Sequence, residues 1–483
     1  MKLAAACVLI AAAGTPAAAE PSGLAPAVLE VPALPQSLSG GAGRPDADAV
    51  QHASAATVLY LNRCKGGCVV HKAALDDART HSSTIPMGSA TDYTLSEFAW
   101  GDDKWNAFMQ CMREVYSPYA VTITDVQPAP GVAYNEGIVA GIDSEVGWSA
   151  GGVAPITSDC SPYSYVISYT FANSFGADST LFTCAVAAQE TGHAFGLDHS
   201  FSYPDGRSAC TDPMSYRGDC GGQRFFRNEA ATCGEYEPRQ CRCGATQNTH
   251  LKLLSVLGAG TPITTPPVVT INAPAAGAQI GNGTAVVATA SAQRGIKTVE
   301  LYLNGYLWTQ VPGVAWGANG QPESGYSLVI PNDVPDGVID IVVKAKDDIE
   351  ATTATETLTV TKGAPCADAS TCLAGQRCDA GRCLWDPPVG ELGDPCDYPQ
   401  FCKNGVCTGT ATETRCTQEC IPNSVGTCPD GFTCLNTSAT EGLCWPSDQI
   451  EDPGCCSTGN AAAAQTGLLA LGLALVLRRR RSR

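Results

Sequence analysis

The chain has 483 residues, 16% of them charged, and a formal net charge of −18. A chain of this length is expected to form about three domains. Lys2 and the five arginines among the last six residues sit at the two ends, so removing these six cations leaves −24 on residues 20–456. A chain this acidic argues against nucleic acid as a partner, because its field repels phosphates.

The N-terminus predicts export. Residues 1–19 combine Lys2, an apolar run and small residues ending at Ala19, which is typical of a cleaved signal peptide. Residues 20–54 are rich in Ala, Pro, Gly and Ser, and we interpret them as a pro-segment or a disordered linker. Of the 25 cysteines, only Cys7 lies in the leader, so the exported chain is predicted to form disulfides in an oxidising compartment.

One stretch carries the pattern Q-E-x-x-H-x-x-G-x-x-H. In a helix, Gln189 and His193 share a face, so both can point at one metal ion. Glu190 lies one step round the helix, where it can reach a metal-bound water. Gly196 can adopt positive φ and end the helix, which would return His199 as a third ligand. This spacing predicts a three-ligand site with an open fourth position, as catalytic zinc requires.

The pattern resembles the active-site motif of the metzincin clan of zinc endopeptidases, and residues 212–216 resemble the clan's Met-turn. The resemblance implies that Met214 lies beneath the zinc and that Tyr216 approaches the zinc or the oxyanion. It also implies that Glu190 is the general base, and Ser200 is similar to the residue that the matrixin branch often shows there. The family's residues carry over onto Glu190, His193, Gly196, His199, Met214 and Tyr216. Gln189, however, stands where the family has His.

Two functions remain open at this stage. The first is an exported Zn²⁺-dependent endopeptidase that acts on proteins or peptides, with His193, His199 and the amide oxygen of Gln189 as ligands. The second is a catalytically inactive metzincin-like scaffold in a surface binding or adhesion protein, since an amide is a poorer zinc ligand than imidazole. Retention of Glu190 favours the enzyme, because a scaffold without chemistry has no need of a base there.

Residues 55–258 are predicted to form the α+β metallopeptidase-like domain. Strands are expected over 56–62, 119–124, 137–142 and 163–171, and helices over 95–116, 181–195 and 249–257. By its position before the zinc helix, the segment 163–171 is either the edge strand that binds substrate in the family or an ordinary interior strand. Cys64 and Cys68 favour a disulfide over a zinc knuckle, and the close pair Cys241 and Cys243 should each bond elsewhere. His250 is predicted to be solvated.

After a linker at 259–267, residues 268–362 show alternating short strands and no cysteine. Asn304-Gly305 is a strong hairpin signal, and the segment predicts an all-β sandwich. It resembles the immunoglobulin-like modules of bacterial surface proteins, which implies a spacer or binding role.

Residues 366–444 hold twelve cysteines and few apolar residues, so bridges must replace a hydrophobic core. They loosely resemble small growth-factor-like modules, and the lack of C-x-x-C pairs disfavours a metal cluster. Residues 454–483 combine Gly454-Cys455-Cys456, an apolar run at 461–477 and an arginine cluster, which predicts a transmembrane helix. The arrangement resembles the C-terminal sorting tails of myxobacterial exported proteins, which implies anchoring at the cell surface or release. The oligomeric state stays open.

Overall fold

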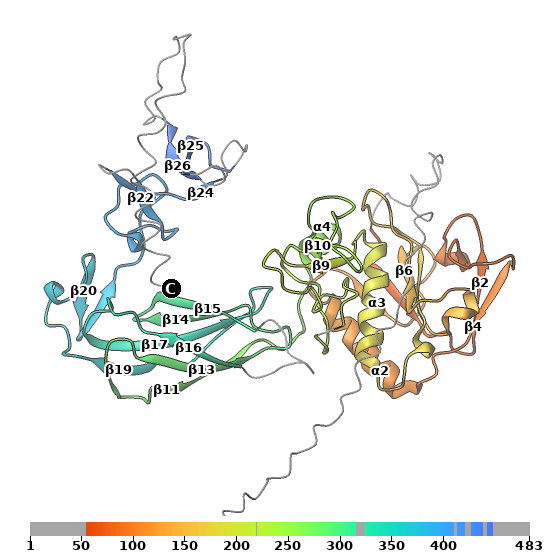
Figure 1. Ribbon diagram of the computed structural model, residues 1–483, viewed down its shortest axis with the longest axis horizontal. Coiled ribbons are helices and arrows are strands. Elements are labelled where there is room, and N and C mark those ends of the chain that lie inside the picture. The colour runs from red at the N-terminus through yellow and green to blue at the C-terminus, as the bar shows by residue number, and fades with distance from the viewer. Residues whose placement is uncertain are drawn as a thin grey trace, which may run out of the picture.

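The structure is a computed structural model that describes residues 55–218, 220–314, 324–409, 413–420, 427–437 and 442–447 (Figure 1). The predicted leader, the segment 20–54 and the C-terminal tail lie outside these residues. In the part of the chain that is described, no helix is long and apolar enough to cross a bilayer. The described part of the chain is multidomain and rich in strands, with few helices, and its last modules are rich in disulfides.

The N-terminal module is built on a five-stranded sheet of order β5-β1-β6-β8-β7. Its strands are β1 (Val58–Asn62), β5 (Thr122–Thr124), β6 (Tyr134–Val139), β7 (Gly152–Val153) and β8 (Ile167–Thr170). The first four strands of the order pair in parallel, whereas β7 is antiparallel to β8. The segment 163–171 therefore supplies an interior strand, and the edge-strand alternative is wrong for it. The edge strand next to β8 is β7, which is too short and glycine-rich to show a strand pattern in sequence.

Two helices cover one face of this sheet, α2 (Gly101–Tyr116) and α3 (Thr180–Ala194), and a disulfide between Cys111 and Cys184 joins them. The helix α3 lies close to the sheet at Gly137, where a Cβ atom would stand 3.2 Å from the Thr191 methyl carbon. Apolar residues of β1, α2 and α3 form the core between these layers. A second core lies on the other face, under a small sheet of β2 (Cys68–Lys72), β3 (Ser82–Ser83) and β4 (Asp92–Leu95).

The rest of this module is mostly irregular chain held by bridges. It contains the two-stranded sheet of β9 (Ser200–Ser202) and β10 (Thr232–Cys233) and the closing helix α4 (Thr249–Leu257), which begins as predicted. Asn248 caps α4 by accepting a hydrogen bond from the Leu251 amide. The prediction of a solvated His250 is wrong, because its Nδ1 lies buried, 3.0 Å from the Tyr119 hydroxyl oxygen. The five disulfides are Cys64–Cys68, Cys111–Cys184, Cys160–Cys243, Cys210–Cys220 and Cys233–Cys241.

The second module is a sandwich of two sheets around one apolar core. One sheet has the order β11-β13-β16, and the other has the order β12-β19-β17-β14-β15 with β18 beside β17. Burial alternates along β17 as the two-residue period of a strand requires. The predicted Asn304-Gly305 hairpin is confirmed, with φ of 50° and 82°, while its second strand β15 was not predicted. The strands are β11 (Val268–Ala273), β12 (Gln279–Ile280), β13 (Ala285–Ser291), β14 (Thr298–Leu303), β15 (Tyr306–Pro312), β16 (Ser324–Val329), β17 (Gly337–Lys346), β18 (Thr352–Ala354) and β19 (Leu358–Lys362).

A buried arginine joins the sandwich to the N-terminal module. Arg294, between β13 and β14, has a fully buried side chain and donates to both carboxylate oxygens of Asp348, at 2.8 and 2.9 Å. It also donates to the Phe226 carbonyl oxygen, and Arg227 donates back to the carbonyl oxygen of Arg294. The two modules are therefore joined by a contact between charged groups that is buried from water, and not by a loose linker alone.

The cysteine-rich region consists of three units with two bridges each. In every unit the first cysteine pairs with the third and the second with the fourth, so the bridges overlap along the chain. The pairs are Cys366–Cys378, Cys372–Cys383, Cys396–Cys407, Cys402–Cys416, Cys420–Cys434 and Cys428–Cys444. Short strands accompany them: β20 (Gln376–Asp379), β21 (Arg382–Trp385), β22 (Cys407–Gly409), β23 (Thr414–Cys416), β24 (Glu419–Cys420), β25 (Phe432–Asn436) and β26 (Gly442–Pro446).

Candidate functional site

The end of α3 creates the site. Gly196 has φ of 85°, which is cheap only for glycine, and a Cβ atom there would stand 2.2 Å from the Cys160 carbonyl oxygen. Leu197 then donates its amide to the Gly192 carbonyl oxygen at 3.2 Å, and the chain reverses. This turn returns His199 to the face of the helix that carries His193.

Replacing Gly196 by Ala is expected to lower the free energy of unfolding of the N-terminal module by about 2–4 kcal/mol, since left-handed strain and a carbonyl clash add together. Denaturant unfolding measures this loss. Gly206→Ala is the matched control, because Gly206 has φ of 84° and nothing within 4 Å of its Cβ position. Equal losses in the two variants would contradict the close contact with Cys160.

The rings of His193 and His199 approach each other through their Nε2 atoms, with their planes nearly perpendicular. The Nε2 atoms of His193 and His199 are 2.9 Å apart, and both side chains are buried. His193 Nδ1 donates to the Leu197 carbonyl oxygen and His199 Nδ1 donates to a Glu235 carboxylate oxygen, each at 2.7 Å. If both rings are neutral, each presents its Nε2 lone pair to the other, and two lone pairs at this distance repel unless a proton or a metal cation lies between them. Two bonds of zinc to nitrogen would hold such atoms ~3.3 Å apart, so the pair fits a metal.

Burial and the neighbouring His199 lower the pKa of His193 to about 3, so its imidazole is neutral at pH 7. A neutral ring whose other nitrogen donates to a carbonyl or carboxylate is the usual state of a metal-binding histidine.

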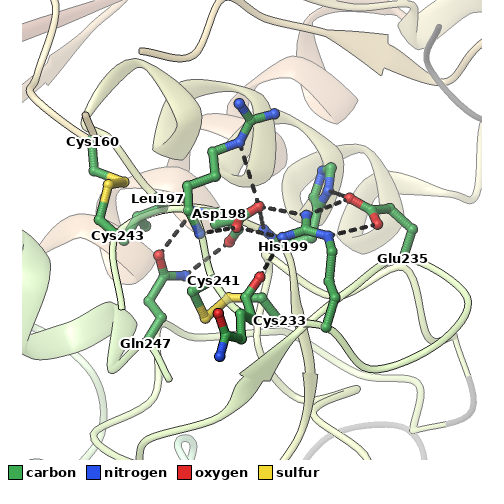
Figure 2. A network of polar contacts seen from close by, with 12 residues as sticks. Cys160, Leu197, Asp198, His199, Cys233, Glu235, Cys241, Cys243 and Gln247 are labelled. Carbon is green, nitrogen blue, oxygen red and sulfur yellow. Dashed lines mark hydrogen bonds and ion pairs between the residues drawn. A yellow bond between two sulfur atoms is a disulfide. The ribbon is translucent and has the colours of Figure 1, made fainter. Parts of the chain in front are cut away.

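A network of charged groups fixes His199 (Figure 2). Arg239 donates to both carboxylate oxygens of Asp198, at 2.7 and 2.8 Å, and to Glu235 at 2.7 Å. Asp198 also accepts the backbone amides of His199 and Arg242. The hydrogen bond from His199, supported by Arg239, holds the pKa of Glu235 far below its usual range, so this carboxylate stays ionised. Asp198, His199 and Glu235 lie close enough to hold a metal, but Arg239 occupies the two carboxylates, which therefore orient the histidine.

Glu190 lies beside the histidines in a pocket with an empty volume of about 440 Å³. Burial raises the pKa of Glu190 to about 8. The edge strand β7 comes very close to it, because a Cβ atom on Gly152 would stand 2.6 Å from the Glu190 Cγ atom. The pocket is lined by Ala150, Gly152, Val153, Ala154, Ile156, Glu190, His193, Asp198, His199, Tyr216 and Arg242.

The segment 212–216 packs against α3 through Met214 and against His199 through Tyr216. Met214 is fully buried, and its sulfur would be 2.8 Å from a Cβ atom on Gly192 of α3. Tyr216 lines the pocket with its ring centroid 4.5 Å from that of His199. Burial, and secondarily Glu190, raise the pKa of the Tyr216 phenol, so it can donate a hydrogen bond at neutral pH. The sequence-predicted residues Glu190, His193, His199, Met214 and Tyr216 are thus brought together.

Gln189 is the exception. It is buried on α3, one turn before His193 and therefore on the same face of the helix, but it is not among the residues that line the pocket. Sequence analysis also missed three charged groups, Glu235, Arg239 and Arg242, that surround the histidines. They follow the motif by 36 residues or more in irregular chain, where no periodic pattern marks a role.

Comparison with known proteins identifies one part of the chain. Residues 267–360 match the family model of the bacterial Ig domain. The second module is a bacterial Ig domain. No curated protein matches the chain. Among solved structures, the Clostridium thermocellum CbhA fibronectin(III)-like modules are similar at 15% identity, covering 20% of this chain and 94% of theirs, with a TM-score of 0.15. A β-glucosidase from Listeria innocua in complex with glucose is similar at 9% identity, covering 48% of this chain and 31% of that chain, with a TM-score of 0.16.

The Ig domain contacts the segment that supports the site. Asp212 accepts the amides of Met214 and Arg227 at 2.9 and 3.0 Å, and Arg227 in turn donates to the backbone of Arg294 in the Ig domain. The Ig domain is therefore connected through two residues to the backbone of Met214.

Proposed function

We propose that residues 55–258 are a metzincin-like, matrixin-type zinc endopeptidase in an exported protein. The observation that carries this proposal is the pair of buried Nε2 atoms of His193 and His199, 2.9 Å apart, with both Nδ1 atoms held by acceptors. These two side chains would hold the zinc. Gln189 would supply the third ligand through its amide oxygen, since it lies one helical turn before His193.

Bound zinc would polarise the scissile carbonyl and lower the pKa of a water molecule. In its ionised form, which a pKa of about 8 makes dominant only above that pH, Glu190 would take the proton of the attacking water and deliver it to the leaving amine, because its carboxyl lies in the same pocket. The Tyr216 hydroxyl would donate to the developing oxyanion. The free edge of β7, whose residues Gly152 and Val153 line the pocket, would pair with an extended substrate backbone.

Export and surface attachment belong to the same proposal. The predicted leader at 1–19, together with eleven disulfides in the described residues, supports an oxidising environment. The apolar run at 461–477 and its arginines would anchor the chain in the membrane or direct its release. The partners would then be proteins or peptides at the cell surface, with the Ig domain as spacer or binding module.

The zinc content of the full chain, expressed with oxidation, tests this function. We expect about one zinc per chain by elemental analysis and its loss in His193→Ala. His71→Ala is the matched control, since His71 is half-exposed on β2, where its Nδ1 contacts Asp92 rather than the site. Gln189→His should tighten zinc binding, because imidazole is the better ligand.

Two results would count against the proposal. Absence of zinc from folded wild-type protein in zinc-supplemented buffer would favour the inactive scaffold with a binding or adhesion role. Unchanged zinc affinity in Gln189→His would remove Gln189 from the ligand set.

A further inference from the structure

We propose that Arg242 makes the pocket selective for a carboxylate on the substrate, either an acidic side chain or a free C-terminus. This inference rests on the proposed peptidase function and names its substrate class. Among the described residues that line the pocket, Arg242 is the only Lys or Arg, and its side chain is 32% exposed.

The Arg242 side chain forms no hydrogen-bonded ion pair with an acidic group in the described part of the chain. Within the described residues, its guanidinium has one close acid, Asp198, at 3.8 Å, beyond hydrogen-bond distance. The Asp198 oxygens already accept two N–H groups of Arg239 and the backbone amides of His199 and Arg242. The guanidinium therefore keeps donors for a ligand, and its planar fork matches a carboxylate.

The backbone that carries Arg242 is fixed in place. Cys241 is bridged to Cys233 and Cys243 is bridged to Cys160, so a disulfide holds the chain on each side of this arginine. Figure 2 shows both bridges next to the network of Asp198 and His199. A backbone held in this way loses little freedom when a ligand binds, so the cost of ordering falls on the Arg242 side chain alone.

Part of the pocket lining is apolar. Ala150, Val153, Ala154 and Ile156 line it, and Val153 belongs to the edge strand β7. A bound peptide would thus meet apolar side chains as well as the cationic side chain of Arg242. In such low-dielectric surroundings, a charge on the peptide contributes more than it does in water.

Two sets of peptides test this inference on the full chain. The first set carries one Glu or one Gln, moved along a neutral sequence that is blocked at both ends. The second set lacks acidic side chains and has either a free or an amidated C-terminus. We expect the charged member of at least one pair to be cleaved with a kcat/KM about 10- to 100-fold higher than its neutral partner, and the pair shows which source of carboxylate is used.

Arg242→Gln should remove this ratio, and Arg242→Lys should restore part of it. Arg113→Gln, an exposed arginine on α2, is the matched control and should keep the ratio. Equilibrium binding of the same labelled peptides to zinc-free protein gives a readout that needs no turnover, and circular dichroism checks that each variant is folded.

The outcomes separate the two proposals. Cleavage without a preference for carboxylates, or a preference that survives in Arg242→Gln, overturns the role of Arg242 and leaves the peptidase intact. A binding preference that depends on Arg242 but comes without cleavage supports the carboxylate site and counts against the peptidase. Absence of both cleavage and preferential binding overturns both.

Discussion

Replacing Glu190 by Gln is expected to lower the rate of peptide hydrolysis by about 10²- to 10⁴-fold while leaving the zinc content unchanged. Gln keeps the size of Glu190 and its place in the buried pocket, but it cannot take a proton from water. The side chain lies on the pocket wall, and the Nδ1 atoms of His193 and His199 donate to Leu197 and Glu235 rather than to Glu190, so the replacement should not disturb the ligands.

The measurement compares single-turnover cleavage and elemental analysis on the same protein sample. Glu356→Gln, an exposed acidic residue of the Ig domain, is the control and should retain full activity. If Glu190→Gln cleaved peptides as fast as the wild type, Glu190 would not be the base, and the catalytic interpretation of the motif would fail.

Replacing Arg294 by Met is expected to lower the free energy of unfolding by about 3–5 kcal/mol, because Asp348, whose side chain is 15% exposed, would keep only its longer ion pair with Arg227, at 3.6 Å. Arg294 is fully buried, and its guanidinium bridges Asp348 and the Phe226 carbonyl oxygen across the two modules. In the folded protein, Arg294 and Arg227 together hold the pKa of Asp348 far below its usual range, even though burial opposes this.

Urea unfolding followed by tryptophan fluorescence measures the loss, with each transition fitted separately because the chain has several domains. The double variant Arg294→Met with Asp348→Asn should recover part of the loss, since it removes the Asp348 charge together with that of Arg294, and only Arg227 then loses an ion-pair partner. Arg382→Met is the control, because its pair with Asp340 is about 30% exposed and should contribute about 0–1 kcal/mol. Equal losses for Arg294→Met and Arg382→Met would contradict the buried contact.

Local patterns predicted the parts of the fold that depend on nearby residues. The helix around the motif was expected over 181–195 and is α3, Thr180–Ala194, because small apolar residues repeat along it. The reversal at Gly196 was also expected, since only glycine accepts that φ cheaply. The proximity of His193 and His199 follows from these two local features.

Tertiary contacts decided what sequence could not show. The edge strand β7 has two residues, so no alternation could reveal it. Glu235 reaches His199, and Arg239 reaches Asp198, only because disulfides and β10 fold an irregular segment back onto the site. Nothing in the sequence marked Arg294 as a contact between modules, because one arginine in a turn is normally solvated.

The overlapping bridges of the cysteine-rich region have a mechanical consequence. When the chain is pulled from both ends, the bridge from Cys366 to Cys378 carries the force directly to Cys378. Only the chain from Cys378 to Cys383, about five residue steps, can then extend, and fully stretched it spans ~17 Å. Without bridges, the same 17-residue separation would extend to ~60 Å. Each unit therefore resists elongation even if its few noncovalent contacts break. Between the Ig domain and the end of the described chain, each of the three bridged units therefore lengthens little under load, and most of the extension falls on the unbridged segments between them.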